Sequence, residues 1–233
     1  HSPTVPAINE PTVISVGVED PDGVGVVNLR WNVNGGAFQT ASMAPTAGDI
    51  YTTTLPGQTG GARIQFYVTA TDELGATSIF PAAGINSRAL YTVEDGQAQL
   101  GNLHNVRIIL TGNDINTLLS STNAHSNQRR GATLIVNESE VFYDVGVRLS
   151  GGASRTSGLV GFNIRLNADN LFRGVHDTIT VDRNNLNESF TRQIYLRTTG
   201  IPKFYNDMIR YIWPGGSHTG FAQLRMARYD DVY

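Results

Sequence analysis

Regular alternation of apolar and polar residues over the first ninety-odd residues is the feature that most restricts the fold of this chain. Ala62–Thr71 and Val26–Val33 both alternate with a period of two, which is the period of a β-strand with one buried face. Asn34-Gly35 follows the second segment, and both positions tolerate the positive φ that a hairpin turn requires. Further strands are predicted at Thr12–Val18, Ile50–Leu55 and Arg88–Val93. We therefore predict an immunoglobulin- or fibronectin-III-like β-sandwich over residues 1–97.

The pattern changes after residue 97, where strands are mixed with helical segments. Strands are predicted at Val106–Leu110, Ala132–Val136, Val141–Leu149, Gly161–Leu166, Thr178–Asp182 and from Phe221. Helices are predicted from Asn113 to about Ser121, from Glu188 to about Thr199, and over Lys203–Trp213. The second of these helices ends at Gly200 and the third at Pro214, which are typical stop signals. The sequence thus predicts an all-β domain followed by an α+β domain over residues 98–233.

Charge and composition exclude several classes of protein. The chain has 17 basic and 20 acidic residues and a formal net charge of −3, which argues against a general polyanion binder and predicts no nucleic-acid partner. No apolar run reaches the roughly 18 residues of a membrane-spanning helix, so no transmembrane segment is expected. The chain contains no cysteine, which removes disulfides, thiolate nucleophiles and zinc–thiolate sites.

Two acidic pairs are candidate metal sites. Asp20 and Asp22, in the segment Asp-Pro-Asp-Gly, could bind Ca²⁺ through clustered carboxylates. The alternative is a β-turn whose aspartates cap backbone amides. Asp230 and Asp231 could bind Mg²⁺, but adjacent residues of a strand point to opposite faces, so both could serve one ion only from a loop. The alternative for this second pair is a solvated terminus.

A glycine-rich segment is a candidate anion site. Ser150–Ser154, flanked by Arg148 and Arg155, could cradle an anion with its backbone amides, and the alternative is a simple turn between two strands. The chain has no Gly-x-x-x-x-Gly-Lys-Ser/Thr stretch and no Gly-x-Ser-x-Gly elbow, so a P-loop and a serine hydrolase are unsupported. Its 5 histidines share no ligand spacing, so zinc is not expected.

The second half of the chain resembles the opening part of the CotH family, which is named for a spore-coat protein. Val145–Ser154, Gly161–Leu166 and Leu171–Gly174 carry the resemblance, and the first half looks like the β-sandwich that precedes such domains in bacterial secreted proteins. The resemblance implies an atypical protein kinase that uses ATP and a divalent metal. It implies as nucleotide- or anion-binding residues Arg148, Ser150, Gly151, Arg165 and Arg192.

The resemblance also implies that the CotH-like α+β domain is incomplete. The family's metal-binding and catalytic acids follow the strand that here begins at Phe221, and this chain ends at Tyr233. An incomplete domain leaves strand edges and apolar surface exposed. We expect another protein, a second copy or a continuation of the chain to cover them.

We therefore expect a non-catalytic, secreted, cell-surface or periplasmic protein that acts through protein contacts, as a structural component of a larger extracytoplasmic assembly. One alternative is an ATP- and Mg²⁺-dependent CotH-type kinase whose catalytic part belongs to a longer chain, so enzyme activity stays undecided at this point. A further alternative is carbohydrate adhesion through the β-sandwich. For the chain as given, the one cofactor that the sequence suggests is Ca²⁺ at the turn of Asp20 and Asp22.

Overall fold

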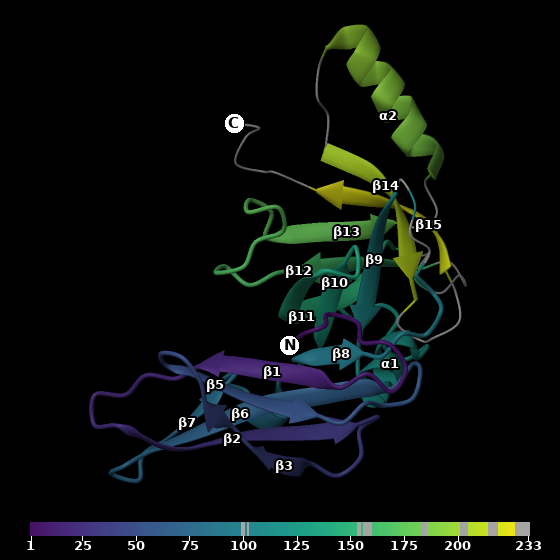
Figure 1. The fold of residues 1–233 in the computed structure, drawn as a ribbon. Coiled ribbons are helices and arrows are strands. Elements are labelled where there is room, and N and C mark those ends of the chain that lie inside the picture. The colour runs from purple at the N-terminus through teal and green to yellow at the C-terminus, as the bar shows by residue number, and fades with distance from the viewer. Residues whose placement is uncertain are drawn as a thin grey trace. The chain divides into compact units, whose positions relative to one another are not determined.

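Strand pairing divides the chain into two units. The computed structural model describes residues 1–98, 101, 103–152, 155, 160–182, 186–200, 205–213 and 219–226. One unit comprises His1–Gly96 with Ile109–Gly112, and the other comprises Gln97–Ile108 with Asn113–Tyr233. We call them the sandwich unit and the barrel unit, after the sheets that each contains (Figure 1).

The sandwich unit consists of two antiparallel sheets. Its elements are β1 (Thr12–Gly17), β2 (Val24–Val33), β3 (Gln39–Ser42), β4 (Ala44–Pro45), β5 (Ile50–Leu55), β6 (Arg63–Asp72), β7 (Thr77–Phe80), the 3-10 helix η1 (Gly84–Asn86) and β8 (Leu90–Thr92). One sheet has the order β1-β5-β4, and the other has the order β3-β2-β6-β7 with β8 also paired to β6. Strands β1 and β7 are therefore edge strands of different sheets.

The core of the sandwich unit is built on the β2/β6 pair. Trp31 of β2 lies opposite Phe66 of β6 in the ladder, and both rings are buried. Leu29 and Ile64 share faces with these rings and are completely inaccessible to solvent. Because residues two apart share one face of a strand, the alternation in the sequence provides this apolar layer directly.

The barrel unit closes seven strands into a ring. Its elements are β9 (His104–Ile109), α1 (Gly112–Leu119), β10 (Arg130–Val136), β11 (Glu140–Ser150), β12 (Gly161–Arg165), β13 (Thr178–Asp182), α2 (Leu186–Thr199), β14 (Tyr205–Ile212) and β15 (Thr219–Met226). The order around the ring is β10-β11-β12-β13-β15-β14-β9. Strand β14 runs antiparallel to β15 and parallel to β9.

Apolar side chains fill the inside of the barrel. Phe162, Ile209 and Leu224 come from three different strands, and none of them is accessible to solvent. The Phe162 ring centroid lies 6.0 Å from that of Tyr211 and 5.3 Å from that of Trp213. Aromatic rings packed at such distances contribute dispersion and burial together, so Phe162 and Tyr211 form part of the barrel core, and the half-buried Trp213 packs against them.

Asparagine-containing turns connect strands in both units. Asn34 and Gly35 have φ of 53° and 77°, and Gly36 N donates to Val33 O at 2.9 Å. The turn is therefore present as predicted, although β3 starts only at residue 39, so the connection is longer than a two-residue hairpin. Asn137 and Glu138 both have φ of 54° and form the turn between β10 and β11.

The α+β class predicted for residues 98–233 is wrong. Strands dominate the barrel unit, and its described residues contain no α-helix besides α1 and α2. Every barrel strand has a neighbour on both sides. The open strand edges expected from an incomplete domain are therefore not found in the described part of the barrel, because ring closure pairs them.

The helix predicted over Lys203–Trp213 is also wrong. Residues 205, 208, 209 and 212 are apolar or aromatic and fit helical spacing, yet Tyr205–Ile212 forms β14. Its partners are β15, which follows it, and β9, which lies about a hundred residues earlier in the chain. Local periodicity does not reveal such distant pairing. Lys203 itself lies outside the described residues.

The two described α-helices have 8 and 14 residues. Helix α2 packs beside β14 and β15. It ends at Thr199, where the sequence predicts. Gly200 stops it with a φ of 71°, and the Gly200 N–H donates to Leu196 O at 2.8 Å. No helix in the described ranges combines the length and the apolar character needed to cross a bilayer.

Candidate functional site

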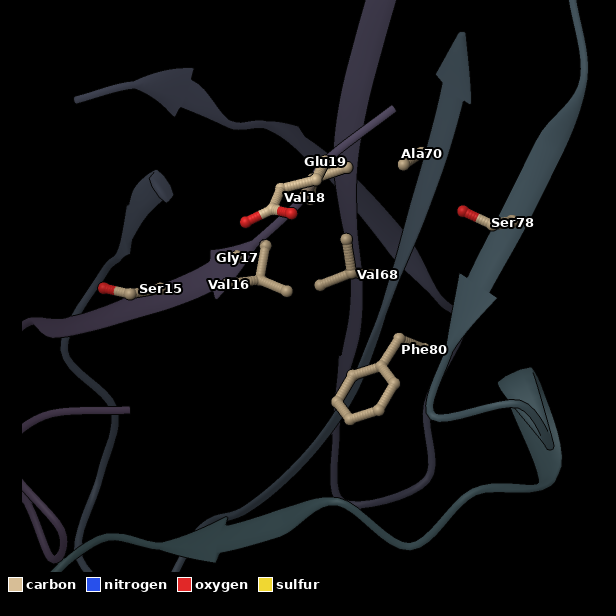
Figure 2. Close-up of a pocket in the computed structure, with 9 residues that line it drawn as sticks. All are labelled: Ser15, Val16, Gly17, Val18, Glu19, Val68, Ala70, Ser78 and Phe80. Atoms are coloured by element: carbon tan, nitrogen blue, oxygen red, sulfur yellow. The ribbon is translucent and has the colours of Figure 1, made fainter. Parts of the chain in front are cut away.

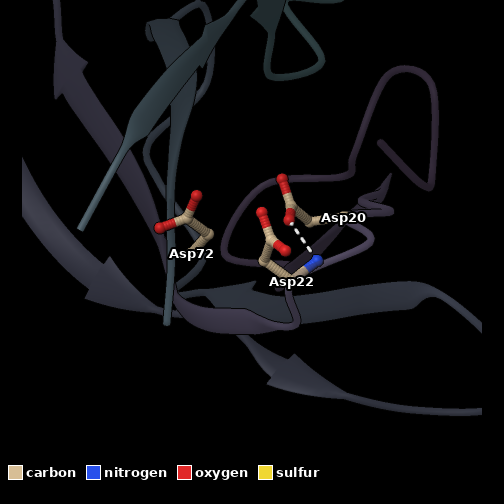
Figure 3. A group of neighbouring side chains, drawn as sticks. All are labelled: Asp20, Asp22 and Asp72. Atoms are coloured by element: carbon tan, nitrogen blue, oxygen red, sulfur yellow. Dashed lines mark hydrogen bonds between the residues drawn. The ribbon is translucent and has the colours of Figure 1, made fainter. Parts of the chain in front are cut away.

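Three aspartates come together beside the β2/β6 pair of the sandwich unit (Figure 3). Asp20 and Asp22 lie in the loop between β1 and β2, and Asp72 is the last residue of β6. Val24, the first residue of β2, lies opposite Asp72 in the ladder, which holds the preceding loop against the end of β6. One carboxylate oxygen of each aspartate lies within 4.8 Å of the other two. We call Asp20, Asp22 and Asp72 the acidic cluster.

Backbone amides satisfy part of the acidic cluster. Asp20 Oδ1 accepts a hydrogen bond from Asp22 N at 2.9 Å, and Asp20 O accepts one from Gly23 N at 3.2 Å. Asp72 Oδ1 accepts from Ala76 N at 2.8 Å. The β-turn interpretation of this segment is thus present in the structure, together with the close approach of the three carboxylates.

The acidic cluster has the oxygen ligands that Ca²⁺ prefers. Its three carboxylates repel one another at this separation unless a cation offsets their charge, and within the described residues none of them forms an ion pair with an arginine or lysine. Asp20 and Asp22 are exposed and Asp72 is half-buried. Calcium binding at Asp20 and Asp22 stays a prediction, to which the structure adds Asp72 as a third ligand.

A second candidate site lies on the outer face of the barrel, where Arg129 crosses strand β11. Its Nη1 donates to Gly146 O at 2.9 Å and to Asn163 O at 3.1 Å, and its Nη2 donates to Asn163 Oδ1. Asn163 in turn donates from Nδ2 to Thr180 Oγ1 at 3.0 Å. A Cβ atom at Gly146 would lie only 2.9 Å from Arg129 Cδ, so glycine leaves the room in which this guanidinium is held.

Two of the arginines named from the sequence flank Arg129. In the β11/β12 ladder Arg148 lies opposite Asn163, and Arg165 lies opposite Gly146, so the two arginines project from the same face on a diagonal. Burial lowers the pKa of Arg129 below its usual value, and the charges of Arg148 and Arg165 lower it further. We call Arg129, Arg148 and Arg165 the arginine cluster.

The arginine cluster contains no carboxylate partner among the described residues. Arg148 donates to Asn127 Oδ1 and to Leu149 O, both at 3.3 Å, and Arg165 makes no hydrogen bond or ion pair with the described chain. Bringing three positive charges together costs free energy, which a bound anion would recover. Chemically, the arrangement can bind an anionic group through charge-assisted hydrogen bonds.

The glycine-rich segment Ser150–Ser154 contributes carbonyl groups to Arg155. Gly151 O accepts from Arg155 Nε at 2.6 Å, and Arg155 N donates to Gly152 O at 3.1 Å. These bonds are those of a turn, in agreement with the alternative interpretation of this segment. Ser150 ends β11 and pairs with Gly161, and no hydrogen bond of its hydroxyl group is seen in the described residues.

The remaining sequence-predicted residues are not placed at either site. Arg192 belongs to helix α2, and its side chain lies outside the described residues, as do Asp230 and Asp231 entirely. Sequence reasoning missed Arg129 and Asp72. The signal for Asp72 was the β2/β6 pairing that two matched alternating segments suggest, whereas Arg129 lies in a polar segment that gave no signal of its own.

Comparisons with known proteins leave the family open. No protein-family model and no curated protein matches the chain, so the CotH resemblance stays a prediction. Two similar solved structures are a Listeria monocytogenes uncharacterized protein, lmo2446, in complex with glucose, magnesium and calcium, and the cycloalternan-forming enzyme of that species with a pentasaccharide substrate. Each is 11% identical over 78% of this chain, with TM-scores of 0.31 and 0.30. The chain spans 16% of the length of those structures, and a likeness this weak supports no inference about function.

Proposed function

We propose that this protein is a non-catalytic interaction protein that binds an anionic group of a partner at Arg129, Arg148 and Arg165. The single observation that carries the proposal is the arginine cluster without a carboxylate partner in the described chain. The net charge of −3 makes the protein a poor general binder of polyanions, so a local cluster of this kind favours one discrete anionic group.

The arginine cluster offers both fixed and free donors. Arg129 is held by Asn163 and Gly146 O, so it provides positive charge at a defined position. Arg148 and Arg165 keep guanidinium donors that the described residues do not use. The planar fork of a guanidinium matches the geometry of phosphate, sulfate and carboxylate oxygens, and these groups are the ligands that we propose.

The surroundings of the arginine cluster favour binding over catalysis. Its hydrogen-bond partners are backbone carbonyls and the side chains of Asn127 and Asn163, with Thr180 behind them. Amides and a hydroxyl of this kind orient a ligand, but they are weak acids and bases at neutral pH. Phosphoryl transfer would need carboxylates that hold Mg²⁺ beside the phosphates. Among the described residues no carboxylate bonds to the arginine cluster, and Asp182, which shares a face with Thr180, pairs with Arg225 instead.

Titration calorimetry with pyrophosphate at low salt tests the proposal. We expect Arg165→Gln to weaken binding about tenfold, which corresponds to one charge-assisted hydrogen bond of about 1.4 kcal/mol. Gly146→Ala should weaken binding as well, because the new methyl group displaces the Arg129 side chain. Arg88→Gln, which removes the same charge from the sandwich unit, is the matched control and should bind as the unaltered protein does. Equal affinity in all variants would show that binding takes place elsewhere.

Two further arms identify the anion and test the enzyme alternative. A tetraglutamate peptide in place of pyrophosphate distinguishes a carboxylate ligand from a phosphate ligand. Incubation with ATP and Mg²⁺ should give no phosphorylated protein and no ADP above a buffer control. ADP formation that disappears in the Arg165→Gln variant would overturn the non-catalytic part of the proposal and favour the CotH-type kinase.

We place this protein outside the cytoplasm, as a component of a larger assembly. The support is the resemblance of its sequence to bacterial secreted proteins. Fractionation of the native host should recover the protein with cell-surface, periplasmic or secreted material, together with the partner that carries the anionic group. Recovery in the cytoplasmic fraction would contradict this location and leave the anion-binding proposal standing.

A further inference from the structure

A groove opens in the sandwich unit between two of its edge strands, β1 and β7 (Figure 2). It has a volume of about 510 Å³ and is lined by β1, β6 and β7. Val68 of β6 is buried at its floor, Val16 of β1 is half-buried in the opposite wall, and Phe80 of β7 is 68% exposed at its rim. Apolar side chains from both sheets therefore meet water along this groove.

Strand β7 has an unpaired backbone edge beside the groove. It pairs with β6 through Thr77–Phe80, and the described residues provide no strand on its other side. All four of its residues are exposed, and none carries a charge. Natural proteins usually protect such edges with charges, bulges or a covering segment. An edge without charges, next to an apolar groove, is the surface to which an extended peptide adds as a further strand.

The groove is acidic at one end. A smaller hollow of about 140 Å³ shares Val18 and Glu19 with the groove and extends it to Asp20 and Asp72. Every charged residue that lines the two hollows is acidic. A bound Ca²⁺ would only partly neutralise this end, because the carboxylate of Glu19 lies outside the acidic cluster.

We propose that β7 and this groove bind an extended segment of a partner protein in which apolar residues alternate with small polar ones and a lysine or arginine follows. Side chains two apart on an added strand face the same side, so apolar residues reach Val68 and Phe80 while the basic residue reaches Glu19. The backbone of the segment pairs with the free edge of β7. This surface belongs to the sandwich unit, and its binding does not depend on the arginine cluster.

Charge decides between a partner protein and a second copy of this chain. Two copies joined through their β7 edges would bring two acidic grooves together, and like charges placed in contact oppose association. A basic segment gains from the same charges. The occupant that fits best is therefore a basic and apolar segment from a different protein.

Fluorescence anisotropy with the full chain, in the presence of a chelator, tests this inference. The probe is a labelled peptide Arg-Thr-Val-Thr-Val-Thr-Arg, which presents the same face in either direction along β7. Its twin with glutamate in place of both arginines should bind at least about tenfold more weakly. Two further twins, N-methylated at the threonines or at the valines, test the backbone pairing, because only one set can donate to β7. One of these two should lose binding and the other should keep it.

Two variants with matched controls locate the binding surface. Phe80→Ser should weaken binding of the basic peptide about tenfold, and Glu19→Gln about fivefold. Ile8→Ser, which alters an exposed apolar residue that does not line the groove, and Asp169→Asn, in the barrel unit, should leave binding unchanged.

Three results would overturn the inference. One is the absence of binding by the basic peptide at about 1 mM, the weak limit of specific association. Another is equal binding of the acidic twin. The third is a dimer of the full chain in light scattering that Phe80→Ser converts to a monomer, since the groove would then be occupied by a second copy.

Discussion

The two units of this protein differ in whether the edges of their strands are paired. In the barrel unit seven strands form a closed ring, so each strand has two neighbours. In the sandwich unit β1 and β7 end their sheets, with a groove of about 510 Å³ between them. In a closed barrel the backbone N–H and C=O groups of each strand pair with its neighbours, which stabilises the fold. At an open edge these groups are unpaired and can bond to a partner strand. The two proposals follow this difference: the barrel would bind an anion through side chains on its outer face, and the sandwich would bind a peptide through the backbone of β7.

The two candidate sites carry opposite charges. The barrel carries the arginine cluster on a face whose backbone is already paired. The sandwich carries the acidic cluster at the end of an open groove. The two proposals therefore assign ligands of opposite charge to the two units.

The largest expected effect tests whether the closed barrel depends on its core. Phe162→Ala should destabilise the barrel unit by about 3–5 kcal/mol, because it opens a cavity beside Tyr211 and Trp213. The matched change on the open unit, Phe80→Ala, should cost about 0.5 kcal/mol or less, since that ring is 68% exposed. The chain has 2 tryptophans, Trp31 in the sandwich unit and Trp213 in the barrel unit. Urea unfolding followed by tryptophan fluorescence therefore reports on the barrel unit in a Trp31→Phe background, where Phe162→Ala is measured, and on the sandwich unit in a Trp213→Phe background, where Phe80→Ala is measured.

An intermediate effect is expected at the buried ion pair of the barrel unit. Arg107 and Glu138 are 3% and 15% exposed, and Arg107 donates to both carboxylate oxygens at 3.1 and 3.2 Å. Glu138→Gln should destabilise the barrel by about 2–3 kcal/mol, because the buried charge of Arg107 loses the carboxylate charge that it pairs with. Asp182→Asn breaks the more exposed pair with Arg225 and should cost less than about 1 kcal/mol. Equal losses in the same unfolding assay would show that burial does not distinguish these pairs.

The smallest effect concerns calcium and the open unit. We expect Ca²⁺ at about ten times its dissociation constant to stabilise the sandwich unit by about 1.4 kcal/mol, without stabilising the barrel unit. Asp72→Asn should remove most of this gain, since it takes away the charge that β6 contributes to the acidic cluster. Thermal unfolding with and without a chelator measures it. An unchanged transition would leave the hydrogen-bonded turn as the full account of Asp20 and Asp22.

Local sequence patterns predicted the parts of the fold that depend on neighbours in the chain. The alternation at 62–71 and the turn at Asn34-Gly35 correspond to β6 and to an observed positive-φ turn. Ring closure depends instead on the pairing of β9 with β14, which no local sequence pattern indicates. For this reason the segment that forms β14 was predicted as a helix. The fold class of the second half was wrong for this reason.

The candidate sites were predictable to the extent that their residues share a segment. Asp20 and Asp22 are two positions apart, so their turn and its clustered carboxylates were evident from the sequence. Asp72 joins them only through the β2/β6 ladder. Arg129 lies beside Arg148 and Arg165 because the glycine at position 146 leaves room for its side chain across β11. No sequence pattern predicts that a side chain will cross a strand in this way.

The odd number of strands in the barrel has a consequence for its biosynthesis. A ring of seven strands cannot alternate direction all the way round, so at least one parallel pair is obligatory, and here it joins β9 to β14. On a ribosome, β9 emerges roughly a hundred residues before this partner, which at typical elongation rates is a wait of about 5–20 s. Throughout that interval the nascent sandwich can already be folded while β9 still presents an unpaired edge. One edge of β9 therefore stays open to wrong pairing until residues 205–212 have left the exit tunnel.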